Sequence, residues 1–268
     1  MVLCAALSSG FKPTITPDMA ILFVAADAAE LKPFEKNLIN ARKLKWPVDY
    51  AFEGILEGRR ILLAANGAGP KLVAQAIEVA NRAIRAAELS SSKLEAIVSV
   101  GFCGGLQPGL RPGQIIVGTE VLNPRDGSRF PCQPIAATCE HQTGVVASQD
   151  RVAIDSQEKA TLFASGAIAV DMESFAVAEG AGRASVPFYC IKAVSDLANE
   201  SFRIDLNKMR TPEGRIARGK IVLYVLTHPW MLGELLRLRR RSQDASRALG
   251  EFLVSCRINF NGDSATVE

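Results

Sequence analysis

Histidine and paired cysteine motifs are scarce in this 268-residue sequence, which argues against several kinds of metal and disulfide protein. Its histidines are His141 and His228, and its six cysteines include no Cys-x-x-Cys pair and no spacing typical of metal ligands. A structural zinc site and a disulfide framework are therefore not indicated. We expect reduced thiols in a cytoplasmic protein.

Long apolar runs and a strong net charge are also lacking. No apolar segment reaches membrane-spanning length, and a formal net charge of +3 is too small to indicate nucleic-acid binding. Residues 1–18 hold a short apolar patch without a basic lead-in, so we expect an N-terminal extension before Met19 rather than a secretory signal. No linker-like stretch divides the chain, which predicts one domain over 19–252 and a tail over 253–268.

Apolar runs that alternate with helical patterns predict an α/β domain. Strands are expected at 19–26, 50–56, 60–65, 96–100, 168–170 and 187–194. Helices are expected from residue 27 onward and at 72–87, 175–184, 212–227 and 229–252, so that 213–252 forms a C-terminal helical part.

The densest group of polar residues lies among the apolar runs of 169–196. Asp171 and Glu173 stand where a strand gives way to a helix of small apolar residues. We interpret Asp171 as a helix cap, whereas Glu173 would be held rigidly at the mouth of a tightly packed helix. Ser195 and Asp196 end the next strand, at the edge where open α/β sheets place ligands.

The segments VDMESFAVAEGA and VPFYCIKAVSD resemble, in order and spacing, signature blocks of the purine nucleoside phosphorylase and methylthioadenosine/S-adenosylhomocysteine nucleosidase superfamily. Further matches are AADAAELKPF, where a glutamate follows a strand, the Gly67-x-Gly69 loop, and the turn from Gly101 to Leu106. By the same resemblance, strands are expected at 112–117 and 144–150. The resemblance implies a nucleoside phosphorylase-like α/β fold with a mixed central sheet, partly curled into a barrel and flanked by helices. It also implies a homo-oligomer and no metal or organic cofactor.

The resemblance assigns roles to individual residues, because two or three carboxyl groups can share the cleavage of a purine N-glycosidic bond. Asp196 would be the general acid at purine N7, and Ser195 would orient it. Glu173 would bind ribose hydroxyls and stabilise the cationic sugar, against which Met172 packs. Glu30 would align or deprotonate the attacking water.

The glycine segments point to ligand binding but also depart from the phosphorylase pattern. Gly67, Gly101 and Gly104 let backbone N–H groups approach a sugar or an anion, although a tight turn needs glycine equally. Phosphorylases of the superfamily usually place an arginine two residues before the first glycine of this turn and a serine just after it, and both touch phosphate. Ser99 and Phe102 stand there instead, so the bidentate clamp is missing. Hydrolysis is therefore favoured, with phosphate as co-substrate of a phosphorylase as the alternative.

Two further positions bear on the substrate. Val152 stands where an aromatic residue is common, so a purine face would pack on it with less stacking energy. Lys192 stands where arginine is frequent, and a structural ion pair and a substrate contact are equally good interpretations.

Two other classes of protein are disfavoured. A catalytically silent nucleoside- or lipid-binding protein would not need Glu30, Glu173 and Asp196 together. A dinucleotide-dependent oxidoreductase would need a complete G-x-G-x-x-G fingerprint, which neither glycine cluster supplies.

Arginines crowd the last expected helix, at positions 237, 239, 240, 241 and 247. A solvated basic face on a core-packed helix is the leading interpretation, and peripheral contact with an anionic membrane is the functional alternative. The segment HPWMLGELLRLRRRSQDASRAL is similar to tails of hopanoid-associated phosphorylases, which cleave adenosylhopane. The sequence leaves open whether the substrate is methylthioadenosine, S-adenosylhomocysteine, a plain nucleoside or adenosylhopane.

Overall fold

A computed structural model of the chain describes residues 19–86, 93–211 and 226–255, together with residues 215, 217, 219 and 224. The expected extension over 1–18, most of the expected helix over 212–227 and the tail beyond Ser255 lie outside the described residues.

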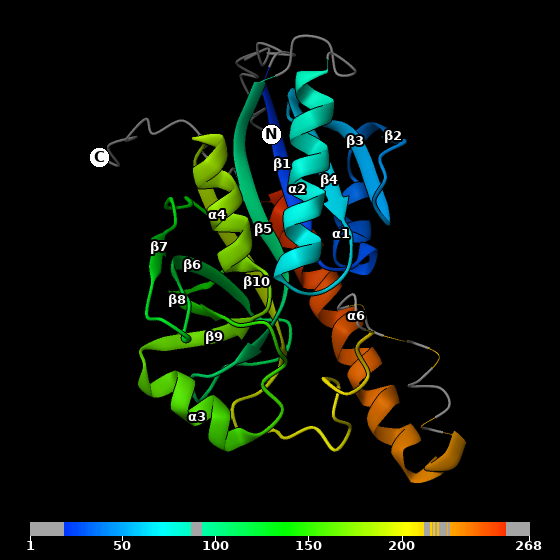
Figure 1. Cartoon of the computed structure of the whole chain (residues 1–268), viewed down its shortest axis with the longest axis vertical. Coiled ribbons are helices and arrows are strands. Elements are labelled where there is room, and N and C mark those ends of the chain that lie inside the picture. The colour runs from blue at the N-terminus through cyan, green and yellow to red at the C-terminus, as the bar shows by residue number, and fades with distance from the viewer. Residues whose placement is uncertain are drawn as a thin grey trace, which may run out of the picture.

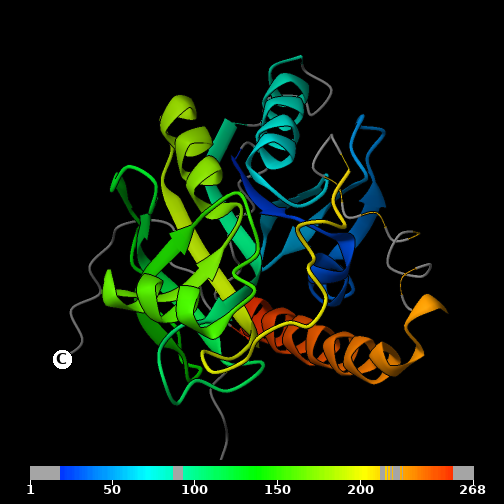
Figure 2. The ribbon, with the colours of Figure 1, turned by 60° about the horizontal axis from the view of Figure 1, so that its bottom comes forward.

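The described strands form one mixed ten-stranded sheet, part of which closes into a barrel (Figure 1). They are β1 Met19–Ala25, β2 Ile39–Lys43, β3 Tyr50–Leu56, β4 Arg59–Ala65, β5 Lys93–Gly105, β6 Ile115–Leu122, β7 Arg129–Pro131, β8 Gln142–Ser148, β9 Ala167–Asp171 and β10 Phe188–Asp196. The order is β10-β6-β8-β9-β5-β1-β4-β3-β2, with β7 beside β6. Because β10 also pairs with β5, the first five strands of this order close on themselves. The expected mixed, partly barrel-like sheet is confirmed. In Figure 2 the green barrel strands gather on one side of the molecule and the blue strands on the other.

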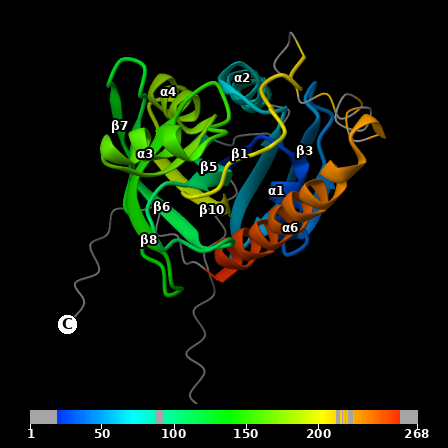
Figure 3. The same cartoon turned by 90° about the horizontal axis from the view of Figure 1, so that it is seen from below.

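Helices cover both faces of the sheet (Figure 3). They are α1 Ala28–Glu35, α2 Pro70–Arg85, α3 Ser156–Ala164, α4 Ser174–Ala184, the short 3₁₀ helix η1 Pro229–Met231 and α6 Leu232–Ser255. Helices α2 and α4 pack together on one face, and α1 and α6 pack together on the other. The helices expected from residue 27 and at 72–87, 175–184 and 229–252 correspond to α1, α2, α4 and η1 with α6.

Strand β1 shows why the sheet needs helices on both faces. Leu22 and Val24 point into the apolar cluster that contains α2 and α4 residues, whereas Ile21 and Phe23 point into the cluster that contains α1 and α6 residues. All four side chains are almost completely buried. A parallel strand that is buried on both faces is continuously apolar in sequence, which is the pattern of the first expected strand.

The strands β4, β1, β5 and β10 run parallel to one another as consecutive neighbours. Their carboxyl ends therefore meet at one edge of the sheet. This edge carries Glu30 just after β1, the Gly67 loop just after β4 and Asp196 at the end of β10. It is the edge at which open α/β sheets bind ligands.

The expected turn that begins at Gly101 is wrong, because β5 continues through Gly105. Gly101 pairs with Lys192 of β10, and Gly105 pairs with Ala169 of β9. Barrel closure requires β5 to hydrogen-bond to both neighbours beyond the point at which β1 ends. The backbone of Gly101, at φ 142°, lets the strand change direction there.

Candidate active site

Glu30 is held in a cradle of three backbone N–H groups at the start of α1. Asp27 is the N-cap, and the Glu30 side chain turns back so that its Oε2 accepts hydrogen bonds from Ala26 N (2.9 Å) and Asp27 N (2.8 Å). Its Oε1 accepts a hydrogen bond from Phe102 N (2.8 Å). The hydrogen bonds to Oε2 are local and include the one expected of a capping box, whereas the hydrogen bond to Oε1 joins α1 to β5.

Burial raises the pKa of the Glu30 carboxyl, although the bonds from Asp27 and Phe102 and the nearby Lys192 ammonium oppose this shift. Gly101 provides the space for the carboxylate, since a Cβ at that position would lie 2.7 Å from Glu30 Oε1. Gly101 therefore accommodates the protein's own carboxylate.

Glu173 occupies the N-cap position of α4, and its side chain reaches across to the loop after β4. Its Oε1 accepts a hydrogen bond from Gly69 N at 2.7 Å. Burial and, second, the charge of Asp171 raise the pKa of Glu173 to about 8, while Lys192 acts in the opposite direction. This carboxyl group is therefore poised to gain or lose a proton near neutral pH.

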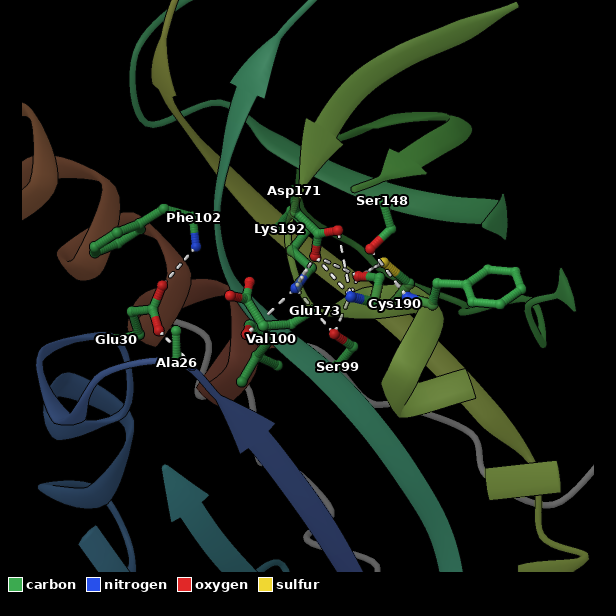
Figure 4. Close-up of polar contacts among 12 residues, drawn as sticks. Ala26, Glu30, Ser99, Val100, Phe102, Ser148, Asp171, Glu173, Cys190 and Lys192 are labelled. Carbon is green, nitrogen blue, oxygen red and sulfur yellow. Dashed lines mark hydrogen bonds and ion pairs between the residues drawn. The ribbon is translucent and has the colours of Figure 1, made fainter. Parts of the chain in front are cut away.

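A buried ion pair lies beneath these carboxylates. Lys192 Nζ is 2.8 Å from Asp171 Oδ2 and donates a hydrogen bond to Ser99 Oγ at 2.9 Å. Burial alone would lower the pKa of the Lys192 ammonium, but the neighbouring negative groups, first among them Asp171, raise it overall. Asp171 also accepts a hydrogen bond from Ser174 N at 3.1 Å, but it ends β9, and the N-cap of α4 is Glu173 and not Asp171 as expected (Figure 4).

Asp196 is held on both oxygens. Ser195 Oγ donates to its Oδ1 at 2.7 Å and also lies 3.2 Å from the Cys103 carbonyl oxygen. Lys159 Nζ of α3 donates to its Oδ2 at 2.5 Å. Gly104 leaves room for this carboxylate, because a Cβ there would lie 3.0 Å from Asp196 Oδ2. Gly101 and Gly104 of β5 thus face two different carboxylates.

Lys159 is the site residue that the sequence analysis missed. It is fully buried, and its ammonium group also donates to the carbonyl oxygens of Leu197 (2.8 Å) and Glu200 (3.2 Å) and lies 5.4 Å from the centre of the Phe202 ring. The sequence held one indication that Lys159 is buried. It precedes Leu162 by three residues, and that spacing places both side chains on one face of a helix. The four partners of the ammonium are far away in sequence and gave no signal.

The remaining expected site residues lie in the loop after β4, in the loop after β8 and between β9 and α4. Gly67 adopts φ 107°, and its N–H donates to the Ala26 carbonyl at 2.8 Å, which ties the end of β4 to the end of β1. Val152 lies in the loop after β8, where Asn207 holds its backbone N–H and C=O at 2.9 and 3.0 Å. Met172 lines a cavity of about 960 Å³ beside α4. Glu30, Glu173 and Asp196 are not among the described residues that line this cavity.

Comparisons with known proteins agree with this fold. The model of the phosphorylase superfamily matches residues 20–226. A 5'-methylthioadenosine/S-adenosylhomocysteine nucleosidase of Staphylococcus aureus is 25% identical over 176 residues, which cover 55% of this chain and 73% of that protein.

Solved structures show the same fold. A methylthioadenosine/S-adenosylhomocysteine nucleosidase from S. pneumoniae, bound to a transition-state inhibitor, superimposes with a TM-score of 0.65 at 15% identity and covers 88% of this chain and 97% of its own. A mutant futalosine hydrolase of Helicobacter pylori gives a TM-score of 0.62 at 13% identity, with 88% and 97% covered. From the match to the family model over most of its length, we conclude that the chain belongs to the phosphorylase superfamily.

Proposed function

We propose that this chain hydrolyses the N-glycosidic bond of an adenine nucleoside of the methylthioadenosine or S-adenosylhomocysteine type. As a member of the superfamily it is an enzyme that cleaves N-glycosidic bonds; the proposal concerns the nucleophile and the substrate. The single observation that carries it is the position of Glu30, whose carboxylate accepts hydrogen bonds from the backbone N–H groups of Ala26, Asp27 and Phe102.

The Glu30 cradle favours water over phosphate as the nucleophile. Backbone N–H groups at a strand end are a ready anion site, and here the protein's own carboxylate fills it. A phosphate dianion bound beside Glu30 would meet a like charge in a poorly solvated place. Ser99, at the position where the phosphorylase pattern has arginine, is buried and accepts a hydrogen bond from Lys192, whose charge is paired with Asp171.

The proposed chemistry divides three tasks among three carboxyl groups. Asp196, oriented by Ser195 and Lys159, takes up a proton from solvent and transfers it to purine N7 of the bound nucleoside, which improves the leaving group. Glu173 binds the ribose hydroxyls and, when ionised, stabilises the cationic sugar of the transition state. Glu30, whose raised pKa makes it a better proton acceptor near neutral pH, deprotonates water on the opposite face of the sugar. These steps need no metal ion and no organic cofactor.

The other expected site residues receive supporting roles in this proposal. Met172 packs against the sugar, the backbone at Gly67, Gly101 and Gly104 allows close approach, and Phe102 and Val152 contact the nucleoside. By the same resemblance we propose a homo-oligomer in the cytoplasm. Adenosylhopane stays in the set of candidate substrates because of the C-terminal segment described above.

The test is to incubate the full chain with methylthioadenosine, S-adenosylhomocysteine, adenosine, inosine and adenosylhopane, each with and without phosphate, and to measure free base. We expect base release that does not depend on phosphate. Asp196→Asn and Glu30→Gln should each lower kcat by roughly two or more decades, whereas Glu78→Gln, on the exposed face of α2, should leave it unchanged. Strict phosphate dependence would contradict hydrolysis, and absence of release from every nucleoside would contradict the whole proposal.

A further inference from the structure

Large apolar side chains in and just before the first turns of α6 are left exposed by the described chain. Leu226, Trp230, Leu232 and Leu236 keep 73%, 69%, 50% and 54% of their surface accessible. They come from η1, from the residues just before it and from the first turns of α6. Exposed apolar residues in such a group mark an interaction surface more often than scattered ones do.

Arginines follow the apolar group on the next turn of the helix. Arg237, Arg239 and Arg240 are exposed, whereas Arg241 is directed to the protein and pairs with Glu200. Leu232, Leu236 and Arg240 are spaced by four residues and share one face of α6 with Arg239. Since each residue adds about 1.5 Å to a helix, Arg237, Arg239 and Arg240 stand roughly 1.5, 4.5 and 6 Å beyond Leu236 along the axis.

The second half of α6 anchors this surface to the body of the protein. Ala245, Leu249 and Phe252 are buried in the apolar cluster between the sheet and α1. Gly250 allows the close approach, since a Cβ there would lie 2.5 Å from Pro33 Cβ. Figures 1 and 2 show the orange first half of the helix extending away from the sheet, so the exposed group lies at a projecting end.

We propose that Leu226, Trp230, Leu232 and Leu236, with Arg237, Arg239 and Arg240, form a docking surface for an anionic phospholipid bilayer. In such contacts apolar side chains enter the boundary between lipid headgroups and acyl chains by roughly 5–10 Å. The arginines that follow the leucines within about one helical turn would then lie at the level of the lipid phosphates and bind them. Tryptophan favours this same boundary. None of the described helices combines the length and apolarity needed to cross a bilayer, so the contact is peripheral. This inference is independent of the proposed reaction.

The charge of this surface favours a lipid bilayer over a second copy of the chain as its partner. A surface between two copies of the chain would bring the three arginines of each copy toward one another unless acidic residues met them. Two acidic residues bound this stretch of the helix: Glu234, which accepts a hydrogen bond from Arg203 N, and Asp244, one turn beyond Arg240. Between them, from Leu235 to Gln243, the helix has no acidic residue and five basic or amide side chains. An anionic lipid surface supplies the complementary charge, and each arginine near it adds binding energy.

The test is flotation of the full chain with vesicles of phosphatidylcholine alone and of phosphatidylcholine mixed with phosphatidylglycerol. We expect binding to the anionic vesicles, weakened by salt. Arg237→Gln/Arg239→Gln/Arg240→Gln should weaken it by roughly a hundredfold, and Leu232→Ser/Leu236→Ser by at least about tenfold. The matched control is Arg82→Gln/Arg85→Gln/Lys93→Gln, which removes equal charge from exposed positions at the far end of α2 and the start of β5 and should bind almost as the parent does.

The fluorescence of Trp230 tests whether this surface is the part of the chain that touches the bilayer. The chain has two tryptophans, of which Trp46 is buried and Trp230 is exposed. In a Trp46→Phe variant the emission of Trp230 should shift to shorter wavelength when anionic vesicles are added.

Three results would overturn the lipid proposal. They are no flotation of the parent chain, equal loss of binding in the remote control variant, and unchanged binding after the two leucine substitutions. If the parent does not float and the leucine variant alone forms smaller assemblies in sedimentation analysis, the surface joins copies of the chain instead.

Discussion

At the scale of single residues, the site depends on buried charges that hold one another in place. Lys159 and Lys192 are both fully buried, and each one pairs with a different aspartate. Such pairs contribute less to net stability than their Coulomb energy suggests, but removal of one partner leaves an uncompensated charge in a dry place. The two lysines therefore fix the geometry of the carboxylates above them.

The first prediction concerns Lys159. Lys159→Met should reduce the free energy of unfolding by ~3–5 kcal/mol, because the Asp196 carboxylate loses its buried cation. Lys159→Met/Asp196→Asn should recover part of this loss, and Lys208→Met, at an exposed lysine, should change little. Urea denaturation of the four proteins measures all three effects. A Lys159→Met variant as stable as the parent would contradict a strong Lys159–Asp196 interaction.

The second prediction uses the raised pKa of Glu173. Between its ordinary value of 4.5 and about 8 the folded chain keeps a proton on this group that the unfolded chain has released. The folded state thus binds more protons there, so this group makes stability fall as pH rises through that window. Glu173→Gln removes the dependence while it keeps an acceptor for Gly69 N. The variant should gain Tm relative to the parent near pH 8 and lose that advantage near pH 4.5; an equal difference at both pH values would contradict the assignment.

At the scale of elements, β5 is the strand on which the site is assembled. It supplies Gly101 and Phe102 to Glu30 and Gly104 to Asp196. Helix α1 brings the Glu30 carboxylate to β5, and strand β10 brings the Asp196 carboxylate. Small changes along this one strand should consequently affect chemistry before they affect the fold.

Gly101→Ala is the sharpest test on β5. The new methyl group would lie 2.7 Å from Glu30 Oε1, and the flexible side chain would swing out of its cradle. We expect kcat to fall by roughly two to four decades, with circular dichroism close to that of the parent. Gly182→Ala on α4, where a Cβ makes contacts of 3.5 Å or more, is the control and should keep full activity. Full activity in Gly101→Ala would show that Glu30 is not needed where the structure places it.

Two glycines of α6, Gly250 and Gly233, test how closely α6 packs against α1. A Cβ at Gly250 would lie 2.5 Å from Pro33 Cβ and 3.0 Å from the Pro33 backbone, whereas a Cβ at Gly233 would meet open space. Gly250→Ala should cost about 1–3 kcal/mol of stability in spite of alanine's better helix propensity. Gly233→Ala should be neutral or stabilising by up to about 1 kcal/mol. Thermal unfolding of the two variants checks the difference, and equal Tm values would contradict the close crossing of α1 and α6.

At the scale of the whole molecule, the sequence predicted the parts that depend on local pattern. The apolar run of β1, the glutamate after it and the carboxylates that flank α4 could all be located, because strand ends and helix starts have recognisable residues. The sequence also predicted the mixed sheet curled into a barrel through its resemblance to a superfamily.

Long-range contacts could not be predicted in the same way. The expected turn at Gly101 was wrong because the pairing of β5 with both β9 and β10 is decided by barrel closure. Lys159 was missed because a lysine on a short helix is ordinarily solvent-exposed, and its partner Asp196 is 37 residues away. The hydrogen bond from Phe102 N to Glu30 spans 72 residues, so the cradle of the proposed base is a product of the fold.

The central claim is that Glu30 delivers water, and the isotopic composition of the sugar product tests it most directly. The chain is incubated with methylthioadenosine in heavy-oxygen water that also contains phosphate, and the sugar is analysed by mass spectrometry. The account predicts a free methylthioribose that carries one heavy oxygen at its anomeric carbon, at a rate that phosphate does not change and that Glu30→Gln reduces. A sugar phosphate without heavy oxygen would contradict it, because phosphate would then have attacked where the structure places Glu30.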